Sequence, residues 1–519
     1  MITRYTASAD NTIVNAYQAG LNTRGTGSNA GLADVIETYS IYGRESISSS
    51  AGPASQELSR ILIQFPITSI SNDRTNGTVP ASGSVKFYLK LFNAPHSKAV
   101  PRDYKLVVYP VAKEWQEGTG LDLEGYKDLT KGNIGSNWMS ASNSTPWTKP
   151  GGDYTTATAN LIYEQTFETG IEDLEVNITP LVESWIAEDT NNYGVGVFLS
   201  SSYEGYFSSS SGTRSGSVLH NPDGATKSYY TKRFFARGTQ YYFKKPVIEA
   251  RWDDSVRDNR ADFYFSSSLA PAADNLNTLY LYNFIRGKLT NIPAIGGGLI
   301  YVSVYSGSAD NTGPSGSALE LYDGKTALTG GYVSTGIYSC SVGIASSSTT
   351  PLYDVWFSGS ATGTIPNASS ATIHYYTGSI IPQVHNASPS EESEIYNLKI
   401  TNLKNTYRRD QFERFNLYVR PKNWNPTIYT KANTIVETTN IQSASYRVIR
   451  TLDNLSVVNY GTGSDKHTVL SYDLNGNYFD FDMKLLEPGY EYKFKFAFYD
   501  DRMNSWVEQQ QDFKFRVEE

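Results

Sequence analysis

The acidic stretch EWQEGTGLDLEGYKDL, residues 114–129, is where side chains able to do chemistry are most concentrated in this sequence. Its carboxylates belong to Glu114, Glu117, Asp122, Glu124 and Asp128. Two carboxylic acids held at a fixed distance across a sugar can hydrolyse a glycosidic bond. Several carboxylates on one flexible loop that contains a glycine can instead bind calcium. A third interpretation is that the acids only form the solvated exterior of an ordered loop.

Calcium is the one cofactor for which the sequence offers ligands. The segment LDLEGYKD places Asp122, Glu124 and Asp128 around a glycine, although it does not match the EF-hand spacing. A weaker candidate is DLNGN, residues 473–477, whose Asn-Gly pair is also the usual sequence of a tight β-hairpin. We therefore name Asp122, Glu124 and Asp128 as the candidate metal ligands and expect no other cofactor.

Patterns typical of catalysis are missing from the rest of the sequence. The histidines are scattered, none forms an i, i+4 metal pair, and there is no nucleophile elbow, phosphate-binding loop or dinucleotide fingerprint. The single cysteine, Cys340, lies in the strand-like run YSCSV, and we interpret it as a small buried apolar side chain. We predict that the chain is not an enzyme and has no catalytic residues.

Length and composition indicate a multidomain all-β protein. A chain of 519 residues exceeds the size that one hydrophobic core supports, so about three domains are expected. The 39 Tyr, 22 Phe and 42 Gly residues favour strands joined by turns. The formal net charge is −8 with both signs interspersed, so we expect no nucleic-acid partner. We find neither a signal peptide nor a long apolar run, and we expect no membrane partner.

The first predicted domain, residues 1–252, consists of short strands separated by polar loops. RILIQFPI and SVKFYLKLF each place alternate apolar residues on one face, as in a half-buried strand. A helix is predicted in NITPLVESWIA, where Thr179 is a suitable N-cap and Pro180 suits the first turn. The run KKPVIEARW is predicted to be the terminal strand of this domain.

The second predicted domain, residues 253–384, begins in the charged junction DDSVRDNRADF. This junction is either a solvated linker with local ion pairs or an assembly contact, and its interface candidates are Asp253, Asp254, Arg257, Asp258 and Arg260. Runs rich in Tyr, Val and Ile follow, and we interpret the recurring SGS and TGS triplets (306–308, 358–360, 377–379 and, further on, 462–464) as turns. The pattern is typical of an immunoglobulin-like sandwich.

The third predicted domain, residues 385–519, contains the most regular alternation in the chain, LEPGYEYKFKFAFYDD. Its aromatic residues project to one face and Glu and Lys to the other, which is the period of two of a strand with one buried face; the aromatic residues are Tyr490, Tyr492, Phe494, Phe496 and Phe498. QDFKFRV is the predicted hairpin partner. The predicted fold class is therefore all-β, with three β-sandwich domains in tandem, the last two immunoglobulin-like or fibronectin-like.

Segments of the first domain, taken in order, resemble a known module. They are ADNTIV, SRILIQF, VKFYLKLF, VYPVAKEWQEGTG, SNW, TPWTKPGGDY, VNITPLVESWIA and NYGVGVFLS. Between residue 5 and about residue 250 they resemble the DNRLRE-type β-sandwich module of surface and adhesive proteins. The resemblance implies a jelly-roll sandwich over residues 1–252. It also implies that Trp115, Trp138 and Trp147 pin the acidic loop to the sandwich while the acids face water. The excursion SSYEGYFSSSSGTRSGSVLH departs from the family pattern.

The complete arrangement resembles structural proteins of tailed bacteriophages, and this implies a function. We expect a structural virion component on the particle exterior, at the neck, tail or capsid surface, assembled in the host cytoplasm. Its expected partners are other virion proteins and further copies of itself, in a homo-oligomer or symmetric ring. One alternative is a capsid decoration protein. Another is a carbohydrate-binding or host-adhesion module, in which Trp147, Tyr203 and Tyr206 stack on surface polysaccharide.

Overall fold

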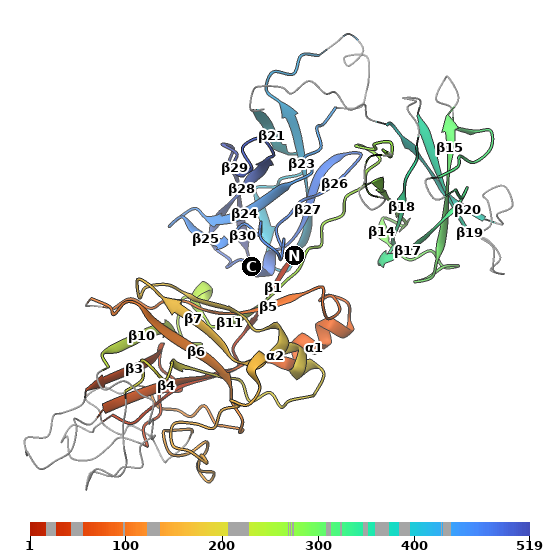
Figure 1. The fold of residues 1–519 in the computed structure, drawn as a ribbon. Helices are drawn as coiled ribbons and strands as arrows, with labels where there is room; N and C mark the ends of the chain where they lie inside the picture. Colours follow the sequence, from red (N-terminus) through yellow and green to blue (C-terminus); the bar gives the residue numbers. More distant parts are fainter. Residues whose placement is uncertain are drawn as a thin grey trace, which may run out of the picture. The chain divides into compact units, whose positions relative to one another are not determined.

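The computed structural model, drawn as a ribbon in Figure 1, divides into two compact units. The first comprises Met1–Asp253 with Gly463–His467, and the second comprises Asp254–Thr462 with Thr468–Glu519. The residues that the structure describes are 1–16, 27–42, 56–96, 99–121, 135–205, 228–267, 269, 271, 275–307, 313–321, 324–345, 351–358, 373–382, 395–426, 428 and 437–519.

The first unit contains two antiparallel sheets. One has the strand order β1-β11-β5-β8, with β1 at Ile2–Thr6, β11 at Val247–Arg251, β5 at Lys86–Leu91 and β8 at Leu174–Asn177. The other has the order β10-β3-β4-β9-β6-β7, with β2 also paired to β4; its strands are β2 Ala9–Val14, β3 Val35–Tyr42, β4 Gln56–Gln64, β6 Tyr104–Pro110, β7 Tyr163–Phe167, β9 Val195–Leu199 and β10 Tyr230–Phe235. Because β1 pairs with β11, the two ends of the first predicted domain lie in one sheet.

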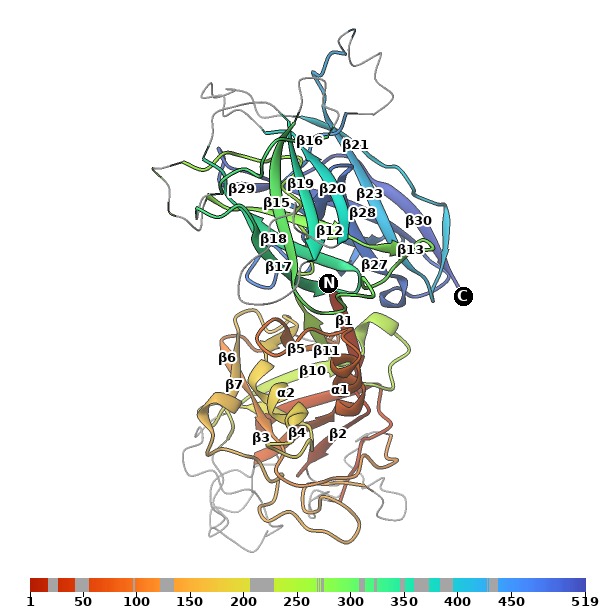
Figure 2. The same cartoon turned by 90° about the vertical axis from the view of Figure 1, so that its right-hand side faces the viewer.

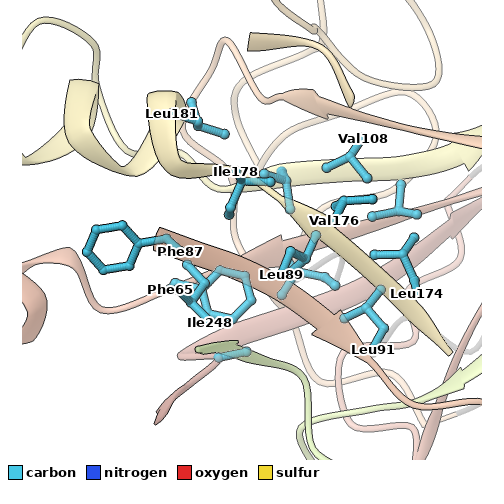
Figure 3. Packing of buried hydrophobic residues seen from close by; sticks show 14 of the residues in the cluster. Phe65, Phe87, Leu89, Leu91, Val108, Leu174, Val176, Ile178, Leu181 and Ile248 are labelled. Carbon is cyan, nitrogen blue, oxygen red and sulfur yellow. The ribbon is translucent and has the colours of Figure 1, made fainter. Parts of the chain in front are cut away.

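The main core of this unit lies where the two sheets and a helix meet. Phe87 and Leu89 of β5, Val176 of β8 and Leu181 of the helix α2 (Thr179–Ile186) all point into it, as Figure 3 shows. Alternate residues of a strand face opposite sides of the sheet, so β5 delivers Phe87, Leu89 and Leu91 to this core, as its sequence predicted. The half-buried interpretation is wrong for β4, because Leu62 on its other face is also fully buried, in a second cluster.

The unit has two α-helices among the described residues, and only one was predicted. In α2 the buried side chains are Leu181, Val182 and Trp185, and the helix begins at Thr179 rather than after it. The other helix, α1 at Ile67–Thr75, buries only Ile70, so its sequence carries almost no apolar period. In the described part of the chain, no helix has the length and hydropathy of a membrane-spanning segment.

The second unit contains the remaining sheets, and its chain order follows two successive sandwiches. The first has the order β12-β18-β17-β15-β19-β20, with β16 paired to β15 and a separate hairpin β13–β14; its strands are β12 Asn277–Tyr282, β13 Phe284–Ile285, β14 Lys288–Leu289, β15 Ile300–Gly307, β16 Pro314–Ser315, β17 Leu328–Ser334, β18 Ile337–Val342, β19 Leu352–Ser358 and β20 Ile373–Ile380. Figure 2 shows β15, β19 and β20 side by side, as their pairing requires.

The following sandwich packs a four-stranded sheet on a six-stranded one. The first is β21-β23-β27-β26, with β21 Tyr396–Ile400, β23 Phe412–Pro421, β26 Ser471–Asp473 and β27 Gly476–Asp482. The second is β22-β30-β28-β24-β25 with β29 paired to β28; its strands are β22 Thr406–Arg408, β24 Ala444–Arg450, β25 Leu455–Val458, β28 Glu491–Asp500, β29 Ser505–Glu508 and β30 Phe513–Glu518. The chain is therefore all-β and built from sandwiches in tandem, which confirms the predicted fold class.

The interpretation of the SGS and TGS triplets as turns is wrong in two places. Residues 377–379 lie inside β20, and Ser306 and Gly307 end β15. Gly378 is required in the middle of β20 because a Cβ there would lie 2.5 Å from Asp354 Oδ1 and 2.8 Å from Arg260 Nε. The glycine in this triplet thus makes room for a buried ion pair and does not turn the chain.

The aromatic alternation of β28 forms the core of the last sandwich, as predicted. Tyr492, Phe494 and Phe496 are fully buried, and the ring of Phe494 lies 4.7 Å from that of Phe515 and 5.2 Å from that of Phe479. Tyr490 is only half-buried because β28 begins one residue after it. The core of this sandwich therefore consists mainly of aromatic contacts in offset and edge-to-face arrangements.

The substitution Phe494→Ala should destabilise the last sandwich by about 3–5 kcal/mol, since it removes a buried ring that its neighbours cannot replace. Phe412→Ala is the matched control, because this ring is 59% exposed; its effect should stay within about 0.5 kcal/mol. Urea titration, with hydrogen exchange of the β28 backbone amides as the readout, measures the loss of stability in both variants. Equal effects of the two substitutions would contradict the assignment of Phe494 to the core.

Candidate functional site

The acidic stretch is only partly within the described residues. Glu114 is exposed and Glu117 is half-buried. The candidate calcium ligands Asp122, Glu124 and Asp128 lie outside the described residues, so calcium binding there stays a prediction. Among the described residues, no three His, Cys, Asp or Glu side chains are grouped as metal ligands.

Glu117 does not simply face water, which corrects the expectation for this acid. Both of its carboxylate oxygens accept hydrogen bonds from Arg237 Nη2, each at 2.9 Å, and Oε1 also accepts the backbone N–H of Asp10 at 2.9 Å. The carboxylate of Asp10 in turn accepts the backbone N–H of Arg237. The carboxylate of Glu117 therefore joins the start of β2 to the segment that follows β10.

The backbone around Glu117 is held by a fully buried amide, that of Asn29. Its Nδ2 donates to the carbonyl of Glu117 at 2.6 Å and to that of Ser136 at 2.7 Å, and its Oδ1 accepts the N–H groups of Gly31 and Gly120, both at 3.0 Å. A Cβ on Gly120 would lie 1.7 Å from the carbonyl oxygen of Asn29. This close packing requires glycine, and it explains the spacing of glycines in EWQEGTG.

Burial dominates the chemistry of Asp10, which is 1% exposed. Desolvation raises the pKa of Asp10 to about 7, and the neighbouring charge of Glu117 adds to the increase, whereas the N–H and the guanidinium of Arg237 lower the pKa. Asp10, Asn29 and Arg237 were not named from the sequence. The only signal was that ADNTIV and EWQEG, which contain Asp10 and Glu117, belong to the segments that carry the family resemblance.

The three tryptophans implied by the resemblance lie in one cluster. Trp115, Trp138 and Trp147 pack with Ile13 and Leu62 against the outer face of β4. The indole of Trp115 donates to the carbonyl of Tyr193 at 2.8 Å, and that of Trp147 donates to the carbonyl of Asn137 at 2.8 Å. They attach the start of the acidic stretch, which contains Trp115, and the segments around Trp138 and Trp147 to the sheet.

The candidate stacking residues do not form an exposed platform. Trp147 is 5% exposed, so its ring has no free face for a sugar, and the prediction that it stacks on polysaccharide is wrong. Tyr203 is half-buried, and its ring meets that of Tyr230 edge to face with centroids 5.2 Å apart. Tyr206 lies outside the described residues.

The charged junction has different surroundings from one residue to the next. Asp253, the last residue of the first unit's main segment, and Asp254, the first of the second unit, are both exposed, and Arg257 is half-buried. Asp258 and Arg260 are almost fully buried, at 3% and 2% exposure. These last two side chains are inside the second unit, so the prediction that they form an assembly surface is wrong.

Arg260 lies between two carboxylates in the second unit. Its Nε donates to Asp354 Oδ1 at 3.1 Å, Nη2 donates to the other oxygen of Asp354, and Nη1 donates to Asp258 and to the carbonyl of Tyr280. Asp354 is fully buried and also accepts the indole N–H of Trp356. Burial raises the pKa of Asp258 to about 6, with Arg260 opposing the increase. The cluster fixes the junction to β19 by paired, hydrogen-bonded charges.

The junction backbone also crosses from one sandwich of the second unit to the other. The N–H of Tyr472 in β26 donates to the carbonyl of Val256 at 3.0 Å, and the N–H of Asp258 donates to the carbonyl of Tyr472 at 3.1 Å. One residue later, the N–H of Asn259 donates to the carbonyl of Thr278 in β12 at 2.9 Å. The junction therefore covers β26 and β12, which both end their sheets.

A cavity of about 180 Å³ lies beside this junction in the second unit. Arg414 and Asp480 in its wall bond to each other through two contacts, at 2.8 and 2.9 Å, and the guanidinium lies 4.3 Å from the ring centroid of Tyr478.

The weaker calcium candidate, DLNGN, is a tight hairpin instead: Asp473 pairs with Gly476, and Asn477 hydrogen-bonds with the backbone of Ile441.

Comparisons with known proteins give little beyond this geometry. No family model matches the chain, and no curated protein matches its sequence. Solved structures that match include fibronectin(III)-like modules of Clostridium thermocellum CbhA, at 9% identity over 51% of this chain and 92% of that one, with a TM-score of 0.14. Trypsin-activated alpha-2-macroglobulin from Escherichia coli matches at 9% identity over 83% of this chain and 29% of that one, with a TM-score of 0.15.

A further match is a putative membrane anchored protein from Corynebacterium diphtheriae, at 9% identity over 100% of this chain and 97% of that one, with a TM-score of 0.14. All three TM-scores lie far below the level at which whole chains superpose. The assignment of the fold therefore depends on the sheets themselves, and no function is inferred from these matches.

Asp10→Asn should change how the stability of the first unit depends on pH. The pKa of Asp10 is about 7 in the folded chain and about 4 in the unfolded chain, so the folded state binds this proton more tightly. The ionised carboxylate therefore lowers stability, and this loss develops as pH rises from about 4 to about 7 and stays complete above that. We expect the variant to lack this loss, a difference of a few kcal/mol between the ends of the range.

Urea unfolding of both proteins at several pH values, followed by hydrogen exchange in β2, measures the difference. The asparagine side chain keeps an oxygen that can accept the Arg237 N–H, so the fold should be retained. Parallel stability curves for the wild type and the variant would contradict the assigned proton uptake.

Arg260→Met should destabilise the second unit by about 3–5 kcal/mol, because it leaves Asp354 and Asp258 buried without their cation. The control is Arg408→Met, since the pair between Arg408 and Asp410 is about two-thirds exposed on both sides; its cost should be about 1 kcal/mol or less. Denaturant midpoints of the two variants give the comparison. A cost for Arg260→Met as small as that of the control would show that the buried cluster does not hold the junction.

Proposed function

We propose that this chain is a structural component of a tailed-bacteriophage virion, on the particle exterior at the neck, tail or capsid surface. It acts through contacts with other virion proteins and not by catalysis. The observation that carries this proposal is the use of the junction: a segment of charged residues ties two sandwiches into one compact unit by paired edges and a buried ion cluster. Such a joint keeps the two sandwiches together as one body.

The motif segments of the first unit support the same role. Glu117 and Asn29 use their polar groups on neighbouring backbone and on Arg237, and the tryptophans fasten the loops to β4. A reactive site needs polar groups that point toward a substrate. Here the polar groups of these residues hold the protein's own loops, which favours an assembly protein over a depolymerase.

The single cysteine is compatible with assembly in a host cytoplasm. Cys340 is buried and unpaired, and burial raises the pKa of its thiol to about 12. The neutral thiol packs among Leu279, Tyr338 and Val342 in the core of the first sandwich of the second unit. It therefore needs no oxidant to form the fold.

We propose two kinds of partner. They are further copies of the chain, in a homo-oligomer or ring, and neighbouring virion proteins.

Mass spectrometry of density-purified particles tests this function. We expect the chain in intact particles at a fixed ratio to the major capsid protein, and we expect electron cryomicroscopy to show three successive sandwiches on the outside. A phage-encoded replication enzyme from the same lysate is the control for contamination. Finding the chain in the lysate but not in the particles would overturn the proposal, as would release of sugars from host polysaccharide by the purified chain.

A further inference from the structure

The hairpin β13–β14 in the second unit has an unusual tip. Phe284 pairs with Leu289 and Ile285 with Lys288, so Arg286 and Gly287 form a two-residue turn. Both have positive φ, 51° and 77°. Asn, Asp and Gly favour this conformation, and an arginine is strained there. The turn therefore presents a basic side chain at a position where the backbone prefers another residue.

Exposed apolar side chains accompany this basic turn. Phe284 is 56% exposed and Ile285 is 42% exposed, and a Cβ on Gly287 would have nothing within 4 Å. The hairpin projects but is firmly based, because Asn283 donates its N–H to the carbonyl of Gly336 at 2.7 Å and its side-chain amide to the carbonyl of Thr290 at 2.6 Å. The tip is thus a preformed projection with apolar and basic groups.

Exposed apolar side chains also occur at the end of β17 and in the segment before β15. The carbonyl of Gly336, which holds the hairpin, follows the exposed Tyr332 and Val333 by a few residues. The ring of Tyr332 lies 6.1 Å from that of Tyr338, whose hydroxyl donates to the carbonyl of Gly296, three residues before the exposed Leu299. We call Phe284, Ile285, Leu299, Tyr332 and Val333, together with Arg286 and Lys288, the basic apolar tip.

The charge of this region has the opposite sign to that of the chain. The chain carries a formal net charge of −8, yet residues 275–307 and 324–345 contain no Asp or Glu. The charged side chains in these ranges are Arg286, Lys288 and Lys325. The acids Asp254 and Asp480 line a cavity with Ser334 and Ile337, which are neighbours of the tip in the chain, so the positive charge belongs to the hairpin turn itself. An exposed apolar hairpin with two cations at its turn has the composition of a segment that enters the headgroup layer of an anionic bilayer.

We propose that the basic apolar tip binds the surface of an anionic lipid bilayer. The side chains of Phe284 and Ile285 enter the boundary between headgroups and acyl chains, and Arg286 and Lys288 remain at the level of the phosphates. A projecting six-residue hairpin is small for a stable protein interface, which needs about 1,000 Å² or more. Insertion of a few side chains is sufficient for reversible membrane contact, and many copies on one particle would add to it by avidity.

This inference goes beyond the structural role, and it differs from the expectation drawn from the sequence that the chain has no membrane partner. That expectation concerned apolar runs and signal peptides, whereas the tip combines residues from the hairpin β13–β14, from the end of β17 and from the segment before β15. Contact with a bilayer surface requires no spanning segment. For an exterior virion protein, the bilayer would belong to the host cell.

Flotation of the full chain with lipid vesicles tests the proposal. We expect binding to vesicles of phosphatidylcholine mixed with phosphatidylglycerol, much weaker binding to phosphatidylcholine alone, and loss of binding as salt rises. Phe284→Ser with Ile285→Ser should lower the affinity by roughly tenfold or more for each side chain. Arg286→Asn with Lys288→Gln should lower it by about fivefold for each charge, with the turn retained because Asn favours positive φ.

Two controls match these variants. Phe412→Ser removes another exposed phenyl ring of the second unit, and Lys422→Gln removes another exposed cation; both should bind as the wild type does. Equal loss of binding in the controls, equal binding to both vesicle types, or no binding by the wild type would each overturn the proposal. Crosslinking of the tip to a protein in intact particles, with no binding to vesicles, would overturn it in favour of a protein partner. Particle composition is measured separately, so the proposed virion role can fail or hold independently.

Discussion

The contact of Arg260 with Asp354 and Asp258 is the constraint on which the second unit depends. A buried guanidinium is tolerated only where carboxylates and carbonyls satisfy it, and here they come from the junction, β12 and β19. The side chain can reach Asp354 only because residue 378 has no Cβ. The buried arginine of the junction thus requires a glycine in β20, although the two residues are more than a hundred positions apart in the chain. The path of the junction between the two sandwiches follows from this contact.

In the first unit, buried polar groups are satisfied by a neutral side chain, the amide of Asn29. Asn29 supplies two donors and two acceptor positions to loops that strand pairing does not reach, and Glu117 with Arg237 adds the charged part. Both arrangements satisfy buried polar groups, mainly carboxylates around Arg260 and backbone groups around Asn29, that would otherwise destabilise the fold. In each case a segment that looked reactive or solvated in the sequence proves to hold the architecture in place.

Sequence patterns predicted what depends on local period, and failed where partners are distant. The alternation in β28 gave its buried face because a strand repeats every two residues, and α2 was recognisable from Pro180 and the apolar residues after it. Helix α1 has a single buried residue, so it left no period to find. The partners of Arg260 and Asn29 lie far away in the chain, and nothing local marks them. Trp147 shows the same limit, since one residue type serves equally well as an exposed platform or as an internal anchor.

The way the junction covers β26 and β12 affects how the chain can be divided into pieces. A fragment that begins at residue 385 would present β26 with its outer hydrogen-bonding groups bare, and such an edge recruits strands from other molecules. A fragment that begins at residue 254 keeps its own cover. A fragment meant for expression should therefore begin before the junction and contain both sandwiches of the second unit.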